Sequence, residues 1–129
     1  RLALDEGVYY AHFLILGGYG DTRENVRETI ENSRRMEYTV MFPYAGMRIY
    51  PHTRLAELAA KEGAIGRDDD LMAPSYYISR DFDLEEVRRA ALATGKAWVF
   101  PDDPQSALAD TLRLKRNKKG PLWEYLRKP

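Results

Sequence analysis

The chain has 129 residues, which suits one ordinary domain, and its 20 basic side chains balance its 20 acidic ones. This neutrality gives no general reason to expect binding to nucleic acid or to an anionic membrane. The chain has no cysteine, which excludes disulfides, thiolate–metal sites and iron–sulfur ligation by its own residues, and favours a cytoplasmic setting. No apolar run approaches the roughly 18 residues that a membrane-spanning helix needs.

The first βα unit spans the N-terminal third of the chain. Residues 1–7 resemble the end of a helix with Gly7 as its C′ residue, so the chain is expected to begin inside a domain. Residues 8–16 form an almost continuous apolar run, which is typical of a strand buried on both faces in a parallel sheet. A glycine-rich turn follows, and Asp21 with Glu24 fits a capping box for a helix over about residues 22–36.

A second unit repeats the pattern. Residues 38–42 are apolar and β-prone, and the prolines and glycine of residues 43–51 indicate an extended loop. Thr53 is expected to cap a short helix that Gly63 ends. The alternation of strand and helix predicts an α/β fold with parallel β/α units.

The remainder is less regular. Residues 74–79 are expected to form a short strand or an extended edge segment. Asp83 and Glu86 fit a capping box for a helix closed by Gly95. A further helix is expected to start near Pro104. We therefore divide the chain into residues 1–79 and a mainly helical C-terminal extension, residues 80–129.

Two loops that follow predicted strands are the candidate sites, because ligands gather at the carboxyl ends of parallel strands. Gly17, Gly18 and Gly20 allow close backbone approach to a ligand, and the following helix N-terminus could hold an anion. The alternative is a tight turn that needs glycine for its geometry. In the second loop Arg48 could clamp a carboxylate or phosphate, or form a structural salt bridge.

Other polar residues give weaker signals. His12 lies within an apolar strand and is most simply structural; the functional alternative points it into a barrel lumen. His52 reads as a surface residue, and two histidines so far apart do not form a convincing metal site. The contiguous acidic residues 68–70 lack the alternating spacing of a calcium loop. The basic residues 113–119 are most simply a solvated helix face, with weak RNA contact as the alternative.

Two segments in sequence resemble radical S-adenosylmethionine (SAM) enzymes. Residues 13–22, FLILGGYGDT, resemble that family's hydrophobic strand followed by G-x-P-G-E-T. Residues 46–63, GMRIYPHTRLAELAAKEG, resemble its later G-x-R-I-Y-P-G-T-x-L-A-x-x-A-x-x-E-G segment. The departures are Tyr19 for proline, Asp21 for glutamate and His52 for glycine. The resemblance covers roughly residues 1–79.

The resemblance implies the closing βα units of a partial, TIM-like (β/α) barrel, with residues 9–16 and 39–42 as its last two strands. In such enzymes a [4Fe–4S] cluster cleaves SAM reductively to give a 5′-deoxyadenosyl radical. By resemblance, SAM or substrate would be bordered by the residues Gly17, Gly18, Gly20, Met47, Arg48, Ile49 and Tyr50. Similar members often carry a preceding cobalamin-binding domain, so cobalamin is a possible cofactor.

The family's Cys-x3-Cys-x2-Cys motif is absent, so this chain alone is expected to be inactive and its parent protein to be the enzyme. The expected partner is the N-terminal half of the barrel. A cut barrel would expose an apolar edge, so the isolated piece is expected to self-associate. The rival functions are a stand-alone α/β binding module for an anionic ligand, and an RNA-contacting accessory domain.

Overall fold

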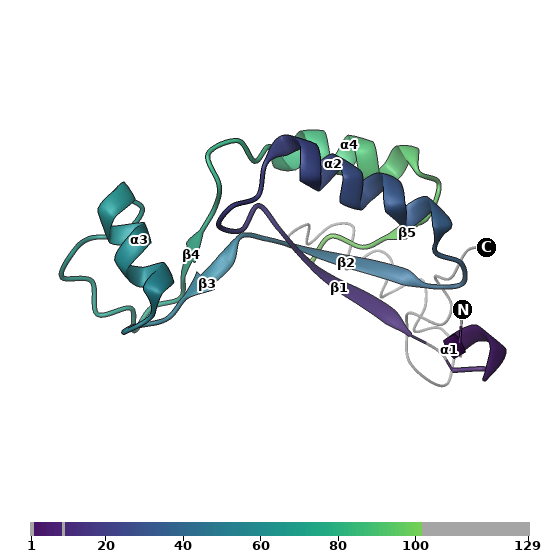
Figure 1. The fold of residues 1–129 in the computed structure, drawn as a ribbon, viewed down its shortest axis with the longest axis horizontal. Helices are drawn as coiled ribbons and strands as arrows, with labels where there is room; N and C mark the ends of the chain where they lie inside the picture. The colour runs from purple at the N-terminus through teal and green to yellow at the C-terminus, as the bar shows by residue number, and fades with distance from the viewer. Residues whose placement is uncertain (1, 9, 102–129) are drawn as a thin grey trace.

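The computed structural model describes residues 2–8 and 10–101. At its centre is a parallel three-stranded sheet with the strand order β1-β2-β5 (Figure 1). Its strands are β1 (Ala11–Leu16), β2 (Val40–Ala45) and β5 (Ala97–Trp98). The predicted α/β fold, with parallel strands alternating with helices, is therefore confirmed, and the described strands form an open sheet.

One face of this sheet is covered by two helices that lie side by side and run in the same direction in Figure 1. They are α2 (Arg23–Asn32), which a 3₁₀ turn over Ser33–Arg35 continues, and α4 (Leu84–Ala93). The core between helices and sheet is built from Leu16, Val26, Ile30, Met41, Val87, Ala91, Trp98 and Phe100. Burial of these apolar side chains supplies most of the stability of this layer.

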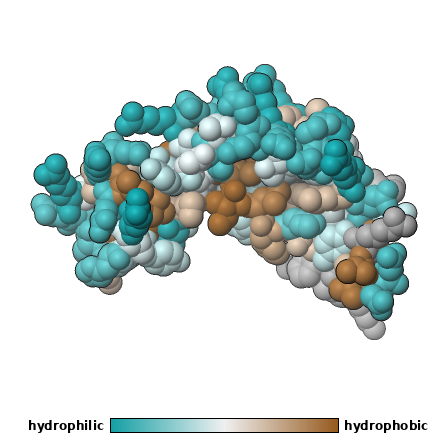
Figure 2. Space-filling view, in the orientation of Figure 1, coloured by the Kyte–Doolittle hydropathy of each residue, from teal (hydrophilic) through white to brown (hydrophobic). Residues whose placement is uncertain are grey.

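The opposite face of the sheet is open over β1 and the end of β2. Leu16 packs into the helix-side core, whereas Phe13 and Ile15 alternate with it and point the other way, 64% and 58% exposed. Tyr44 of β2 is 41% exposed. Figure 2 shows hydrophobic surface on this concave side of the molecule, beneath the polar helix layer. The prediction that residues 8–16 are buried on both faces is therefore wrong for one face.

A smaller lobe lies at the other end of the molecule. Strands β3 (Met47–Ile49) and β4 (Ser75–Tyr77) pair antiparallel, and α3 (Arg54–Glu62) packs against them. Its core consists of Ile49, Ala59, Leu71 and Tyr77. The predicted strand at residues 74–79 is confirmed. The predicted loop over residues 43–51 is wrong in part, because it contains the end of β2 and all of β3.

Most predicted helix ends are confirmed. Thr53 caps α3 by accepting the N–H of Ala56, and Gly63 ends it with φ 75°. Asp83 caps α4. The N-terminal helix is α1 (Leu2–Asp5), followed by Gly7 at φ 66°.

The capping box of α2 is placed differently from the prediction. Thr22 is the N-cap and shares a reciprocal pair of hydrogen bonds with Asn25. Asp21 is not available as the cap, because its carboxylate accepts the N–H of Gly18. The predicted box of Asp21 with Glu24 is therefore wrong by one residue.

The C-terminal part joins the same core as the N-terminal part. α4 packs against α2, and β5 extends the sheet beside β2 through the pairs Val40↔Ala97 and Met41↔Trp98. Residues 80–101 thus share a hydrophobic core with residues 1–79. The helix expected near Pro104 and the basic run 113–119 lie outside the described residues. No helix in the described part of the chain is long and apolar enough to cross a membrane.

Candidate functional site

The two candidate loops begin side by side at the carboxyl edge of the sheet. The glycine loop (residues 17–20) follows β1, and the arginine loop (residues 46–53) follows β2. Leu16 and Ala45 are register partners, and the N–H of Gly46 donates to the carbonyl of Leu16 at 2.7 Å. The structure thus brings both predicted loops to the edge at which parallel α/β sheets bind ligands.

The three glycines of the glycine loop differ in their backbone conformation and in what lies beside them. Gly17 has φ 74°, and a Cβ atom there would lie 2.5 Å from Cγ of Phe82. A Cβ atom on Gly18 would lie 2.8 Å from Sδ of Met47. Gly20 has φ 86°, and the position of its Cβ is open. The tight-turn interpretation therefore accounts for Gly17 through its φ and its packing, and for Gly20 through its φ. Gly18 lies against the flexible end of Met47, and Gly20 has free space beside it.

Internal hydrogen bonds hold the glycine loop in shape. The N–H of Gly18 donates to Oδ2 of Asp21 at 3.0 Å, and the N–H of Asp21 donates to the carbonyl of Gly18 at 3.1 Å. Ser79 binds both ends: its N–H donates to the carbonyl of Gly17 at 2.8 Å, and its hydroxyl donates to the carbonyl of Asp21 at 2.9 Å. The loop is therefore preformed.

The N-terminus of α2 already has carboxylates beside it. Asp21 lies just before the helix, and Glu24 lies in its first turn. The backbone N–H of Glu24 and the hydroxyl of Thr22 hold the pKa of Glu24 below its ordinary value. Negative charge is favourable at this helix end, and here the chain supplies it. An external anion would meet like charge at this position, which weighs against the helix N-terminus as the anion site.

The arginine loop presents a cation without a carboxylate partner among residues 2–8 and 10–101. The guanidinium of Arg48 is exposed and lies over the ring of Tyr50, 4.9 Å from its centroid. Tyr76 is its register partner across β3 and β4. Both tyrosines are about half exposed, at 53% and 54%. The salt-bridge alternative for Arg48 thus finds no support in the described part of the chain.

The remaining predicted residues of this loop have different surroundings. Ile49 is 1% exposed and belongs to the core of the small lobe, so its side chain cannot contact a ligand. Met47 lies against Gly18 and links the two loops. His52 is exposed, with φ 60°, in the turn before α3.

An aromatic contact joins the glycine loop to the small lobe. The ring of Tyr19 packs edge-on against Tyr77, with centroids 5.7 Å apart. The hydroxyl of Tyr77 donates to Oε2 of Glu62 at 2.8 Å, and this bond, with burial, raises the pKa of Tyr77 above its ordinary value of 10.0. Tyr19 and Asp21, which replace the proline and glutamate of the resembling family, therefore both contribute to fixing the loop.

Substitution Tyr77→Phe is expected to lower the free energy of unfolding by about 1 kcal/mol near neutral pH, because one hydrogen bond to a carboxylate is lost. The neutral phenol is favoured in the folded state, so its contribution is complete below pH 10 and is lost as the pH rises through the raised pKa. Urea unfolding at several pH values should show the difference between wild type and variant shrinking in alkali. A constant difference would contradict this; Tyr76→Phe, at an exposed ring, is the control.

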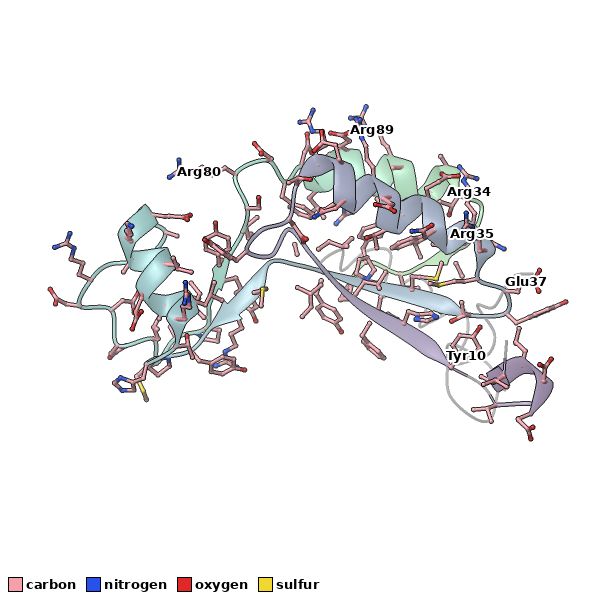
Figure 3. The ribbon with its side chains drawn as sticks, viewed as in Figure 1. Tyr10, Arg34, Arg35, Glu37, Arg80 and Arg89 are labelled. Carbon is pink, nitrogen blue, oxygen red and sulfur yellow. The ribbon has the colours of Figure 1, made fainter. Side chains whose placement is uncertain are left out.

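Two hollows of the described structure lie away from the arginine loop. A crevice of about 20 Å³ between the first turns of α2 and α4 is walled by Val26 and Phe82, and Arg27 pairs with Glu86 at its rim. This volume holds a water molecule at most. A hollow of about 800 Å³, lined partly by Tyr10 and Glu37, lies at the amino end of β1 (Figure 3). The crevice is also lined by Gly17 and Asp21, just after the carboxyl end of β1, but it is too small for a ligand, and the larger hollow lies at the opposite end of that strand.

The histidine and acidic candidates gain nothing from the structure. His12 alternates with Phe13 and so lies on the helix side of β1, with its ring 5.4 Å from that of Tyr10. It does not point to the open face that would form a barrel lumen. Within the described ranges, no group of three or more histidine, cysteine, aspartate or glutamate side chains could hold a metal ion.

Sequence reasoning missed Ser79 and Phe82, which hold the glycine loop. They lie about 60 positions after the loop, and no short motif connects them to it. Comparisons with models of protein families, with curated proteins and with solved structures found no match.

Proposed function

We propose that this chain supplies the closing βα units of a SAM-binding barrel in a radical SAM enzyme. The proposal rests on the two family-like segments, in the family's order, and on the way their loops meet at one edge of a parallel sheet. The observation that carries it furthest is the open face of that sheet. Such a face is unusual, because parallel sheets in water are normally covered on both sides.

The open face has the character of a barrel interior. It carries Phe13, Ile15, Phe42 and Tyr44, and the ring of Phe13 stacks on those of Phe42 and Tyr44 at 5.2 and 6.3 Å. Among residues 2–8 and 10–101, the helices α2 and α4 cover the other face (Figure 1). A barrel has this arrangement, with helices outside and apolar side chains inside.

The outer edge of β1 supports the same proposal. β1 is a terminal strand of the three-stranded sheet, and it pairs only with β2 among the described strands. Its sequence, AHFLIL, carries no lysine, proline or bulge of the kind that protects natural edge strands. A preceding parallel strand of the same protein, paired to this edge, would continue the sheet and begin to enclose the open face.

Arg48 is the side chain that we propose to contact an anionic group of SAM or substrate. Its planar fork suits a carboxylate, and no carboxylate in the described part of the chain occupies it. Tyr50 and the open position beside Gly20 would border the same ligand. Met47 and Gly18 set the distance between the two loops rather than binding the ligand.

The iron–sulfur cluster does not fit this chain. Such clusters are held by cysteine thiolates, and the chain has none. Its ligands would therefore come from another part of the parent protein, and the 129 residues alone would not cleave SAM. No feature of the described residues bears on cobalamin.

The test uses the complete product of the gene that encodes this chain, purified without oxygen and assayed for 5′-deoxyadenosine release from SAM. Arg48→Ala is expected to lower kcat/KM for SAM roughly tenfold to a hundredfold, as loss of a charge-assisted hydrogen bond predicts. Arg54→Ala, an equal change at the exposed start of α3, is the control and should stay within about twofold of wild type. Equal effects of the two substitutions would refute the role of Arg48.

The solvent-exposed guanidinium of Arg48 also favours a second candidate, a stand-alone module that binds a small anionic carboxylate or phosphate. This module would bind its ligand without iron and without a further barrel half. The basic run behind the RNA-contacting alternative, residues 113–119, lies outside the described residues. Arginines of the helix layer pair with Glu31, Glu85 and Glu86, and Figure 3 shows Arg34 and Arg89 on its outer side, away from both loops.

A further inference from the structure

A segment far along the chain closes over the glycine loop. We call residues 77–82 the strap, since this segment leaves β4 and runs past the loop to α4. Ser79 is at its centre. Its backbone N–H binds the carbonyl of Gly17 at 2.8 Å, and its hydroxyl binds the carbonyl of Asp21 at 2.9 Å. One residue therefore holds the first turn of the loop and its end.

The bond from the Ser79 hydroxyl is the start of a short chain of hydrogen bonds. It fixes the backbone of Asp21, and the carboxylate of Asp21 accepts the N–H of Gly18 at 3.0 Å. The N–H of Asp21 returns to the carbonyl of Gly18 at 3.1 Å. Movement of Asp21 would thus release Gly18 as well, because three bonds depend on one backbone position.

Two apolar contacts of the strap act at the same loop. Phe82 fills the space beside Gly17, where even a methyl group would not fit. Tyr77, 6% exposed, packs against the ring of Tyr19. These contacts hold the strap against the loop. The hydroxyl of Ser79 adds a directional hydrogen bond that fixes the end of the loop at Asp21.

We propose that Ser79 is a positioning residue that holds the glycine loop in the conformation in which it meets the ligand. The identity of that ligand as SAM rests on the proposed function. The effect on the loop does not, since it follows from the hydrogen bonds alone. Ser79 itself binds the loop's own carbonyl groups and takes no part in chemistry.

The substitution Ser79→Ala removes the hydroxyl but leaves the backbone bond to Gly17. The free energy needed to open the end of the loop at Asp21 should then fall by the contribution of about one hydrogen bond. This corresponds to roughly fivefold faster exchange of the Gly18 and Asp21 amide hydrogens. Ser75→Ala is the matched control: Ser75 lies in β4, just before the strap, and its hydroxyl has no partner among the described residues. Ser79→Thr restores the hydroxyl.

The experiment measures amide exchange by NMR in the 129-residue chain and SAM kinetics in the complete gene product. Ser79→Ala alone should speed exchange at Gly18 and Asp21 and raise KM for SAM about fivefold with kcat unchanged; Ser79→Thr should restore both to within about twofold. Unchanged exchange, or equal exchange in Ser75→Ala, would overturn the proposal. Faster exchange with an unchanged KM would also overturn it, because the loop would then position no ligand.

The two proposals can fail separately. If the gene product releases no 5′-deoxyadenosine, the proposed function fails. The exchange measurement still decides whether Ser79 holds the loop.

Discussion

Gly46→Ala is expected to destabilise the chain by roughly 3 kcal/mol or more, the largest effect we expect from a single methyl group. Gly46 has φ 76°, and a Cβ atom there would lie 2.5 Å from the carbonyl oxygen of Tyr77 and 2.7 Å from Cγ1 of Ile78. The oxygen belongs to the backbone, so it cannot move aside as a flexible side chain would. Gly46 joins β2 of the central sheet to β3 of the small lobe. Relief of the clash would therefore move the strands of the two lobes apart.

Gly63→Ala is the matched control for this prediction. Gly63 has nearly the same φ, 75°, but nothing lies within 4 Å of its Cβ position. Its substitution should therefore cost only the left-handed backbone strain, about 1 kcal/mol. Urea unfolding of both variants separates strain from steric clash. Equal losses of stability would show that the contact between Gly46 and Tyr77 does not constrain the fold.

The 129-residue chain is expected to self-associate through the open face of its sheet, and Ile15→Glu is expected to weaken that association at least about tenfold. Ile15 and Phe13 are more than half exposed, and their described neighbours on this face, Phe42 and Tyr44, carry no charge. Among the described strands, β1 is at the edge of the sheet. A buried carboxylate there would lose its hydration without gaining a partner. Sedimentation velocity across a concentration series measures both the wild type and the variant.

Leu92→Glu controls for simple loss of apolar surface. Leu92 is 67% exposed on α4, in the helix layer that covers the other side of the sheet. Its substitution should leave the association unchanged. A wild-type chain that stays monomeric at high concentration would contradict the prediction and weaken the proposal that the open face is meant to be covered.

The helices were predictable because their signals are local. The hydroxyl of Thr53 accepts the N–H that lies three residues later, and Gly63 adopts the left-handed conformation. Both features are short-range, so any packing would retain them. The cap of α2 was misplaced by one residue for a non-local reason. The carboxylate of Asp21 accepts a hydrogen bond from the glycine loop, and its carbonyl accepts one from the strap. Thr22 is then the last extended residue before the helix and becomes its cap.

The end of β2 was missed because Pro43 indicates a loop. In the structure Pro43 pairs with Leu14 inside the strand. Among the described residues, β5 pairs with β2 at Val40 and Met41. Beyond this point the described part of the chain gives β2 a strand on one side, and β2 tolerates proline there as an edge strand does. Proline does disfavour central strands, but applying this rule requires knowing which strands lie at the edge of the sheet. The sequence does not show that order.

The open face and the strap could not be predicted from local sequence. An apolar run such as residues 8–16 looks the same whether both faces are covered by the chain itself or one awaits another partner. Ser79 reaches Asp21 across 58 positions, and a serine in an extended segment carries no sign of its partner. The convergence of the two loops did follow from the sequence, because parallel strands place their carboxyl ends together.

The reading frame upstream of the codon for Arg1 tests the central proposal most directly. The chain has no cysteine, so an enzyme of the proposed kind must supply its cluster ligands from elsewhere in the same protein. We expect a Cys-x3-Cys-x2-Cys motif in the same frame, followed by the βα units that pair with β1. A start codon directly before Arg1, with no upstream domain, would contradict the proposal and leave the anion-binding module as the better account.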